Sequence, residues 1–399
     1  MAIDETNKRI KIAFLTSFDP RDRRSWSGTV YYLAQSLQKY CGDVTYIGPM
    51  NIWEKKLGKV INKVTLLLFK KQFAYNHSFL LAKKYAKVAQ QRLEGHVYDL
   101  IVTVAGAAEI SFLQTNVPLV LIEDATFVLL RNYYPQYSNL LDISVRETNA
   151  TETIAIQKAS LCIYSSEWAA RSAIDVYGAD AHKVRVVPYG ANIEVEPARE
   201  LVLERRRSSD ICRLLFVAVN WRRKGGDIAF EALLKLEEMG IQAELTVCGC
   251  VPPARFTHKH LKVIPFLDKN DEVQRKKLEQ LFLQSDFLLL PTRGDCTPMV
   301  FCEAGAFGLP VITTDTGGVS GVITEGENGF MLPMSASGDA YAELIARVYQ
   351  DDLRYHELIQ SSRAVYENRL NWDAWGKTVK ELFAEMLKDE QAIDHQYQR

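Results

Sequence analysis

The chain has 399 residues, a formal net charge of −1 and seven scattered cysteines. This length favours two domains, and the balanced charge excludes bulk electrostatic binding of nucleic acid. No window reaches the ~18 apolar residues of a membrane-spanning helix. The charged N-terminus, MAIDETNKRIK, lacks the apolar stretch of a signal peptide. The cysteines do not form two pairs at zinc-binding spacing, so we expect reduced thiols in a cytoplasmic protein.

The first half of the chain alternates apolar segments with helical patterns. The segments rich in Val, Ile and Leu predict strands at residues 10–17, 44–48, 100–105, 118–122, 161–164 and 184–188. Helical spacing follows the first of these at Val30, Leu33, Ala34 and Leu37. Strands of this composition separated by helices predict a parallel sheet that is covered on both faces.

A charged segment with little apolar content, residues 194–210, then interrupts the pattern as a linker does. The alternation restarts after it. It predicts strands at residues 214–219, 243–248, 263–266, 287–290 and 311–314, and helices at residues 225–239, 271–284 and 298–307. We therefore expect an α/β protein with two doubly wound, Rossmann-like domains that face a central cleft.

Two motifs in the second half of the chain contain the charged residues that could bind a ligand. Residues 291–318, PTRGDCTPMVFCEAGAFGLPVITTDTGG, place Asp295 in a loop after a strand and Glu303 in the helix that follows. Upstream, the sequence WRRKGG places Arg223 and Lys224 just before Gly225. Carboxylates suit sugar hydroxyls, whereas cations before a helix N-terminus suit a diphosphate. Together they predict a nucleotide-sugar site.

These motifs resemble those of the retaining glycosyltransferases of family 4 (glycosyl transferases group 1), which have the GT-B fold. The resemblance is strong across residues 214–333. Before them it rests on three pieces, SWSGT at 25–29, the strand at 99–104 and VRVVPYGAN at 184–192. It implies an acceptor-side domain at 1–192, a linker at 193–212, a nucleotide-sugar-binding domain at 213–370, and a C-terminal helix at 371–399 that returns to the first domain.

The last helical segment has an apolar stripe of its own. Residues three or four apart form it: Trp372, Trp375, Val379, Leu382 and Met386. The resemblance implies that this helix crosses back to the first domain. The alternative is a helix that packs on the second domain.

The resemblance also implies a reaction, a metal-independent hexosyl transfer that retains the anomeric configuration. The donor would be a UDP- or GDP-sugar, the acceptor a hydroxyl of a glycan or lipid-linked glycan in polysaccharide biosynthesis, and no cofactor would take part. Lys224 and Arg223 would stabilise the departing diphosphate. Glu303 would accept hydrogen bonds from the ribose, and Asp295 would bind the donor sugar, one methylene shorter than the family's usual glutamate.

Further donor-binding candidates lie around these residues. The set comprises Gly28, Gly225, Phe266, Leu267, Thr297, Pro298 and Met299. Some of the candidate site residues also have a simpler structural interpretation. The WRRKGG segment could be a solvated basic turn, Asp295 a helix N-cap, Gly28 an ordinary strand-to-helix turn, and Phe266 a core residue. Pro298 has no N–H, so one backbone donor that family members use is missing.

The chain departs from the family pattern in two further places. Val219 stands where the family's arginine would fall, so either Arg222 or Arg223 supplies that charge from a different backbone position or the second cation is absent. The segment PLVLIEDATF, residues 118–127, lacks the usual histidine, which leaves Asp124 as the acceptor-side candidate with Glu123 beside it. Both acids could instead cap a helix that starts near residue 127. The seven histidines show no recognisable ligand cluster, so we expect no metal site.

Residues 53–73 bear on whether the protein attaches to a membrane surface. They hold six lysines against one glutamate, with Leu57, Val60, Ile61, Val64 and Leu68 at helical spacing. Such a helix can lie on an anionic membrane surface, which would place the protein at the inner face of the cell membrane. The alternative is a helix packed on its own domain with its lysines in water.

Two rival functions remain open from the sequence. A sugar-nucleotide epimerase would need paired acid and base residues that the sequence does not show. A non-catalytic scaffold or binding protein would explain Val219, Pro298 and the missing histidine.

Overall fold

The structure is a computed structural model that describes residues 9–204 and 210–397, without the side chains of 391–397. The chain divides into two compact units. The first consists of Met1–Pro188 with Trp375–Arg399, and the second of Tyr189–Ala374. The predicted linker at 193–212 lies in the second unit, and its residues 205–209 are outside the described part.

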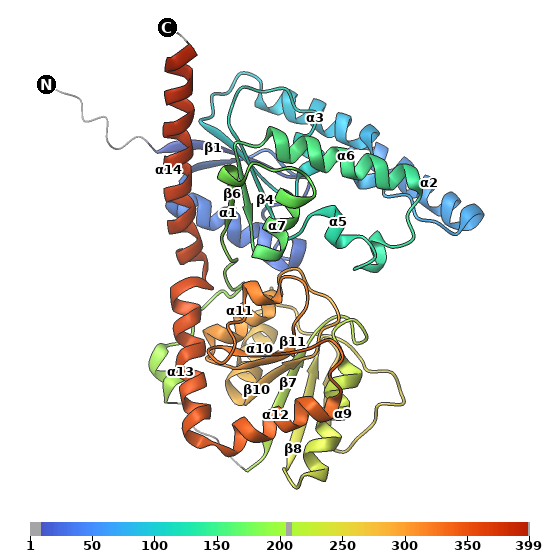
Figure 1. The fold of residues 1–399 in the computed structure, drawn as a ribbon, viewed down its shortest axis with the longest axis vertical. Helices are drawn as coiled ribbons and strands as arrows, with labels where there is room; N and C mark the ends of the chain where they lie inside the picture. The colour runs from blue at the N-terminus through green and yellow to red at the C-terminus, as the bar shows by residue number, and fades with distance from the viewer. Residues whose placement is uncertain (1–8, 205–209, 398–399) are drawn as a thin grey trace, which may run out of the picture. The chain divides into compact units, whose positions relative to one another are not determined.

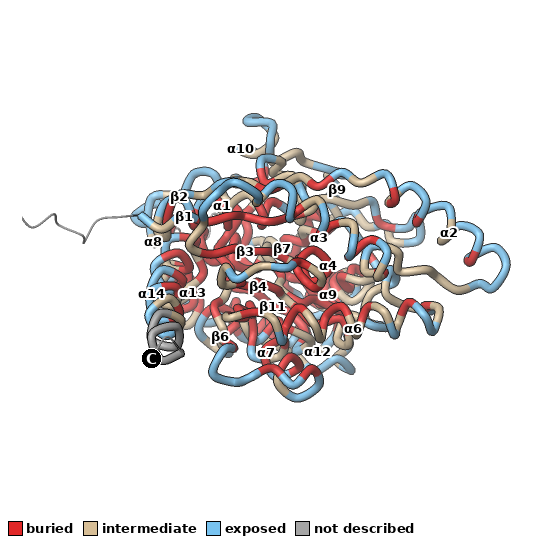
Figure 2. The backbone as a smooth tube through the Cα atoms, turned by 90° about the horizontal axis from the view of Figure 1, so that it is seen from above, coloured by how far each residue is buried: buried red, intermediate tan, exposed pale blue. Residues whose placement is uncertain are grey.

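The first unit contains a six-stranded parallel sheet with the order β2-β1-β3-β4-β5-β6. Figure 1 shows this sheet with helices around it. Its strands are β1 (Ile10–Leu15), β2 (Gly42–Tyr46), β3 (Leu100–Val104), β4 (Leu119–Glu123), β5 (Leu161–Tyr164) and β6 (Val184–Val186). Every residue of β3, β4 and β5 is buried, whereas the edge strands β2 and β6 are partly exposed, as Figure 2 shows for the sheet. Full burial explains the continuous apolar runs in the sequence.

Helices separate these strands. They are α1 (Thr29–Tyr40), α2 (Glu54–Phe69), α3 (Phe79–Leu93), α4 (Ala107–Ile110), α5 (Phe127–Leu130), α6 (Asp142–Lys158) and α7 (Glu167–Asp175). The helical spacing after the first strand is confirmed, since Val30, Leu33, Ala34 and Leu37 of α1 are all buried.

The helix α2 buries a different face from the one that its sequence suggests. Glu54, Gly58 and Thr65 are its buried residues. A Cβ on Gly58 would meet the Tyr75 ring at 2.7 Å, so only glycine allows this packing. The predicted apolar stripe instead faces solvent, with Leu68 65% exposed. The helix therefore packs on its own unit, as the alternative expected, but through a face other than the apolar stripe.

The C-terminal helix α14 (Trp372–Tyr397) groups with the first unit from Trp375 onward. Val379 and Phe383 are fully or almost fully buried. A Cβ on Gly376 would lie 2.4 Å from the Ser36 hydroxyl of α1, so this glycine lets the two helices approach closely. The alternative that placed the stripe on the second domain is wrong for these residues.

The second unit contains another six-stranded parallel sheet, with the order β12-β11-β10-β7-β8-β9. Its strands are β7 (Cys212–Val217), β8 (Ala243–Cys248), β9 (Leu261–Ile264), β10 (Phe287–Leu290), β11 (Val311–Thr314) and β12 (Gly329–Leu332). The sequence missed β12, a half-buried edge strand. The predicted strands at 214–219 and 263–266 begin and end two residues too late.

Helices also surround this sheet. They are α8 (Arg199–Leu203), α9 (Gly226–Glu238), α10 (Glu272–Gln284), α11 (Met299–Ala306), α12 (Gly338–Gln350) and α13 (Asp352–Arg369). The short helix α8 lies within the segment that was predicted to be a linker, and its Val202 is fully buried. Among the described residues, no helix has both the length and the apolar content needed to cross a membrane.

Candidate functional site

The second sheet has a topological switch point between β7 and β10. The chain runs from β7 to β8 on one side, whereas β10 pairs with β7 on the other. In open α/β sheets, ligands bind outside the carboxyl ends of the strands at such a point. The loop after β7 carries Arg223 and Lys224, and the loop after β10 carries Asp295. The topology therefore brings the two motifs together.

These three residues form a charge cluster in which Lys224 and Asp295 are buried and Arg223 is partly exposed. The Lys224 ammonium donates to the Asp295 carboxylate, and both residues are less than 10% exposed. The Arg223 guanidinium lies 3.6 Å from the other Asp295 oxygen and donates to the Gly294 carbonyl at 2.7 Å. Burial lowers the pKa of Lys224, whereas the Asp295 charge acts to raise it. The interpretation of WRRKGG as a solvated turn is therefore wrong for Lys224.

The glycines of this motif are required by packing. Gly225 has a φ of +75°, and a Cβ there would lie 1.9 Å from the Pro291 carbonyl oxygen. A Cβ on Gly226 would lie 2.2 Å from the Trp221 ring. Gly225 is the N-cap of α9, so the helix begins directly behind the Lys224 cluster. The positive end of the helix dipole therefore adds to the potential of the two cations.

Glu303 is the second buried acid, in α11. It is 3% exposed, and its carboxylate accepts a hydrogen bond from the Lys269 ammonium. Burial raises the pKa of Glu303, and the charge of Lys269 acts in the opposite direction. A carboxylate has two oxygens, so a ribose hydroxyl can be bound beside the lysine. The sequence analysis did not identify Lys269, because nothing in the spacing links residue 269 to the helix.

The start of α11 settles one alternative for Asp295. Pro298 is the N-cap of this helix, and no side chain caps it. Asp295 instead holds the two cations, and its carbonyl accepts from the Gly318 N–H at 3.0 Å. The N-cap interpretation of Asp295 is therefore wrong. Thr297 and Met299 flank Pro298 and are half-buried.

Two exposed residues follow the ends of strands. Phe266 lies just after β9 and is 62% exposed, so the alternative that made it a core residue is wrong. Leu267 packs partly against the core of the unit. Val219 follows β7 and is 74% exposed. Arg223 lies beside Lys224 and Asp295, which supports it as the source of the second charge.

In the first unit, Gly28 ends a loop with unusual backbone angles. Its φ is +93°, and Trp26 and Ser27 before it have φ values of 49° and 56°. Three successive positive φ values are costly for residues other than glycine. A Cβ on Gly28 would lie 3.1 Å from the Arg23 carbonyl oxygen. This turn before α1 is therefore more constrained than an ordinary strand-to-helix turn.

The acceptor-side candidate Asp124 directly follows β4 and is half-buried. Thr126, rather than either acid, is the N-cap of α5. Glu123 is buried next to Glu152, and burial raises the pKa of both, that of Glu152 to about 7. Glu152 also accepts a hydrogen bond from the Phe127 N–H at 3.3 Å. Glu123 therefore lies against Glu152 rather than at the cap position of α5, and the cap interpretation of Asp124 stays a prediction.

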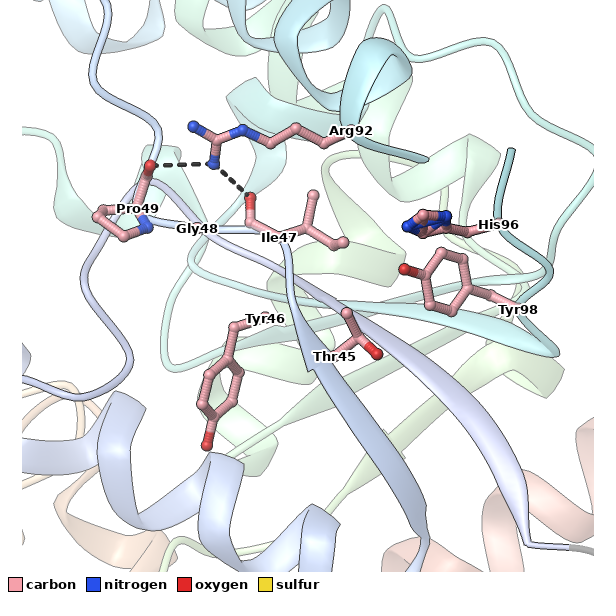
Figure 3. A pocket seen from close by; sticks show the side chains of 8 residues that line it. All are labelled: Thr45, Tyr46, Ile47, Gly48, Pro49, Arg92, His96 and Tyr98. Atoms are coloured by element: carbon pink, nitrogen blue, oxygen red, sulfur yellow. Dashed lines mark hydrogen bonds between the residues drawn. The ribbon is translucent and has the colours of Figure 1, made fainter. Parts of the chain in front are cut away.

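The first unit also contains a pocket outside the predicted residues. It has a volume of about 450 Å³ and lies beside the end of β2 (Figure 3). Arg92 closes one side, donating to the carbonyls of Ile47 and Pro49 at 3.2 and 3.1 Å. His96 and Tyr98 line the other side. The Arg92 hydrogen bonds show that this arginine holds the backbone after β2.

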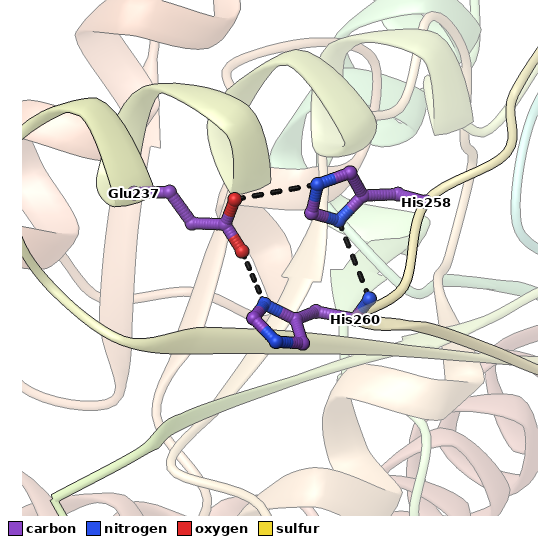
Figure 4. Close-up of side chains that lie close together, drawn as sticks. All are labelled: Glu237, His258 and His260. Atoms are coloured by element: carbon purple, nitrogen blue, oxygen red, sulfur yellow. Dashed lines mark hydrogen bonds and ion pairs between the residues drawn. The ribbon is translucent and has the colours of Figure 1, made fainter.

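One prediction from the sequence needs correction. The histidines were expected to form no ligand cluster, yet the structure brings His258 and His260 together with Glu237 (Figure 4). Glu237 lies in α9, more than twenty residues upstream of the two histidines. Only the packing of α9 beside the segment that leads into β9 joins them.

Comparison with known proteins identifies the family that the second unit matches. Residues 212–365 match the model of the family described as glycosyl transferases group 1. A D-inositol 3-phosphate glycosyltransferase of Xylanimonas cellulosilytica is 24% identical over 253 residues, which cover 59% of this chain and 60% of that protein. The matched region thus spans only about 60% of the length of that curated relative.

Solved structures match over nearly the whole chain. Sucrose-phosphate synthase from Thermosynechococcus elongatus has a TM-score of 0.67 at 16% identity and covers 96% of this chain and 100% of its own. The Anabaena protein Alr3699/HepE, solved with UDP and glucose, has a TM-score of 0.61 at 16% identity and covers 94% and 100%. These likenesses confirm the predicted GT-B fold with two Rossmann-like domains.

Proposed function

We propose that this chain, whose second unit belongs to the glycosyl transferases group 1 family, transfers a sugar from a nucleoside diphosphate sugar to a hydroxyl acceptor. The charge cluster of Lys224, Arg223 and Asp295 at the switch point carries the proposal. It supplies two cations and a helix N-terminus where a diphosphate leaving group needs them. The Anabaena neighbour solved with UDP and glucose supports a uridine nucleotide as the donor.

The transfer needs no metal ion and retains the anomeric configuration in this proposal. The bond from the sugar C1 to the β-phosphate oxygen breaks, and a bond from C1 to the acceptor oxygen forms on the same face. The acceptor proton passes to the departing phosphate oxygen. Lys224 and Arg223 stabilise the negative charge that grows on that phosphate. Electrostatic attraction is stronger at a site removed from water, because the effective dielectric constant is lower there.

The two acids have separate roles. Asp295 positions both cations through its carboxylate and reaches the donor sugar from the same loop. Glu303 binds the ribose hydroxyls, and the charge of Lys269 opposes the rise in the pKa of Glu303 that burial causes. Phe266, exposed at the end of β9, offers an apolar face for the base. Thr297, Met299 and Leu267 complete the donor pocket, and Asp124 acts on the acceptor side.

The acceptor belongs to a membrane surface in this proposal, as a glycan or lipid-linked glycan. Helix α2 supports this location, because its exposed apolar residues lie among its lysines. Those residues are Leu57, Val60, Val64, Leu66, Leu67, Leu68 and Phe69. A basic helix with exposed apolar side chains binds anionic interfaces by both charge and burial.

The direct test is a thermal-shift panel of UDP-, GDP-, ADP- and dTDP-sugars with and without EDTA. A ligand at about 100 times its dissociation constant stabilises the folded chain by roughly 2.7 kcal/mol. We expect one nucleotide to raise the melting temperature without dependence on EDTA, and slow hydrolysis of that donor to release the sugar with its anomeric configuration retained. No shift with any nucleotide would favour a non-catalytic scaffold.

A further inference from the structure

Two histidines and one glutamate converge on the second unit, away from the proposed donor site. Glu237 lies in the last turn of α9, whereas His258 and His260 lie in the segment before β9. The donor cluster lies at the other end of α9. Gly226 to Glu237 is eleven residues, so the two sites are about 16 Å apart along the helix axis.

The three side chains present their ligand atoms to one point. One atom from each residue lies within 4.8 Å of the other two. The Glu237 carboxylate contacts His260 Nδ1 with one oxygen, and its other oxygen lies 3.3 Å from His258 Nε2 (Figure 4). Two ligands of a tetrahedral ion at zinc-to-nitrogen distances lie roughly 3.3 Å apart. The Glu237–His258 contact already has this separation, whereas the Glu237–His260 contact would have to widen on zinc binding.

We propose that Glu237, His258 and His260 bind a zinc ion. Two imidazoles and one carboxylate are a ligand set that Zn²⁺ takes with a water as its fourth ligand. The site is accessible, since the side chains are 25%, 20% and 40% exposed. It also lies at the C-terminal end of α9, where the helix dipole favours a cation.

Zinc binding would determine which ring nitrogen of His258 carries the proton. His258 Nδ1 now accepts the His260 backbone N–H at 3.3 Å, a long hydrogen bond. Coordination through Nε2 requires the ring proton on Nδ1, so this weak bond is given up.

The ion stabilises the segment that carries the two histidines. Aromatic contacts connect this segment to the donor motif, with ring centroids 6.4 Å apart for His258 and Phe230, 5.3 Å for Phe230 and Phe256, and 5.2 Å for Phe256 and Trp221. Trp221 lies directly against Gly226 at the start of α9. The role that follows is structural, and it is independent of the proposed transfer reaction.

The test is calorimetric titration of Zn²⁺ into the full chain after EDTA treatment and removal of the chelator. We expect one equivalent to bind. The His258→Gln/His260→Gln double variant should lose roughly 100-fold or more in affinity, and Glu237→Gln roughly tenfold or more. A His96→Gln/His182→Gln variant is the matched control, because both rings lie in the first unit, and it should bind like the wild type.

Co²⁺ and nucleotide binding complete the design. Visible absorption of bound Co²⁺ should appear in the wild type and the control but not in the double variant. No zinc binding to the wild type, or equal binding by the double variant, would overturn the proposal. UDP binding is expected to be the same in all four proteins. If the wild type does not bind UDP, this result would count against the proposed transfer reaction and not against the zinc site.

Discussion

The Lys269 ammonium donates a hydrogen bond to the buried carboxylate of Glu303, and the two residues are 34 positions apart in the sequence. Glu303 is almost fully buried, so its carboxylate would favour the protonated form without a nearby cation. The lysine therefore opposes protonation of the buried acid that we propose as the hydrogen-bond acceptor for the donor ribose.

Lys269→Met should shift the pH dependence of nucleotide binding. Burial already raises the pKa of Glu303, and removal of Lys269 raises it further. Protonated Glu303 binds ribose hydroxyls less well, so binding should fall off at a higher pH than in the wild type. Calorimetric UDP titrations from pH 5 to 8.5 measure this shift. Lys276→Met is the control, because Lys276 forms an exposed pair with Glu272, and an identical profile for the two variants would contradict the assignment.

Lys224→Met should cost both activity and stability. It leaves the buried Asp295 with Arg223 as its remaining cation, at 3.6 Å. Loss of one partner of a buried pair destabilises by about 3 kcal/mol. Adding Asp295→Asn removes the second charge and should restore part of this loss in a urea denaturation, whereas donor hydrolysis stays at least about 100-fold reduced. A double variant no more stable than the single one would show that the pair contributes little.

The two ends of α9 offer a matched pair of glycine substitutions. Gly225 and Gly240 have φ values of +75° and +79°. A Cβ on Gly225 clashes with the Pro291 carbonyl, whereas one on Gly240 meets no atom within 4 Å. Gly240→Ala should therefore cost only the backbone strain, about 1–2 kcal/mol. Gly225→Ala should cost several kcal/mol more in melting experiments and abolish UDP binding. Equal costs would mean that Pro291 moves freely.

The buried pair of Glu123 and Glu152 should make the first unit less stable as the pH rises. Burial raises the pKa of both carboxyls, that of Glu152 to about 7 from 4.5. The folded state then holds protons that the unfolded chain releases above pH 4.5, so stability is lost as the pH rises toward 7. The expected loss is about 3 kcal/mol or more.

Glu152→Gln removes this titration. The amide oxygen can still accept the Phe127 N–H, so the variant should be more stable than the wild type at pH 8. Urea midpoints between pH 5 and 8 measure the slope, and Glu147→Gln on the same helix α6 is the control. If the slope of the urea midpoint against pH is unchanged in Glu152→Gln, the Glu123–Glu152 pair does not cause the pH dependence.

The exposed face of α2 should bind anionic vesicles. Leu67 and Phe69 are 72% and 63% exposed, so Leu67→Ser/Phe69→Ser removes apolar area without changing the charge. Cosedimentation with vesicles that contain phosphatidylglycerol should fall about tenfold or more, at roughly 25 cal/mol per Å² of lost burial. Val97→Ser/Val176→Ser is the control with comparable exposure in the same unit. Equal binding by the two variants would remove α2 as the docking surface.

The sequence predicts most of this fold because its central strands are buried on both faces. The strands β5, β8, β10 and β11 lie at the predicted residues. The edge strand β12 was missed because it is short and only half-buried. In helix α2 the apolar pattern does not identify the buried face. The apolar stripe at helical spacing is largely exposed, and the helix buries Gly58 and Thr65 instead.

The proposed site was predictable to the extent that it depends on strand order. Arg223, Lys224 and Asp295 follow neighbouring strands of the sheet, so their motifs meet for a topological reason. Lys269 and the zinc-ligand candidates were not found, because their partners come from helices whose packing no local pattern specifies.

The discontinuous first unit has a consequence for protein synthesis. Ser36 of α1 lies against Gly376, so α14 covers one face of α1. The ribosome makes residues 189–374 between them, at roughly 5–20 residues per second. The nascent first unit therefore waits roughly 10–40 s with this face bare. Chaperone binding to stalled chains should be strongest during that interval, and a fragment that ends before α14 should be difficult to express in soluble form.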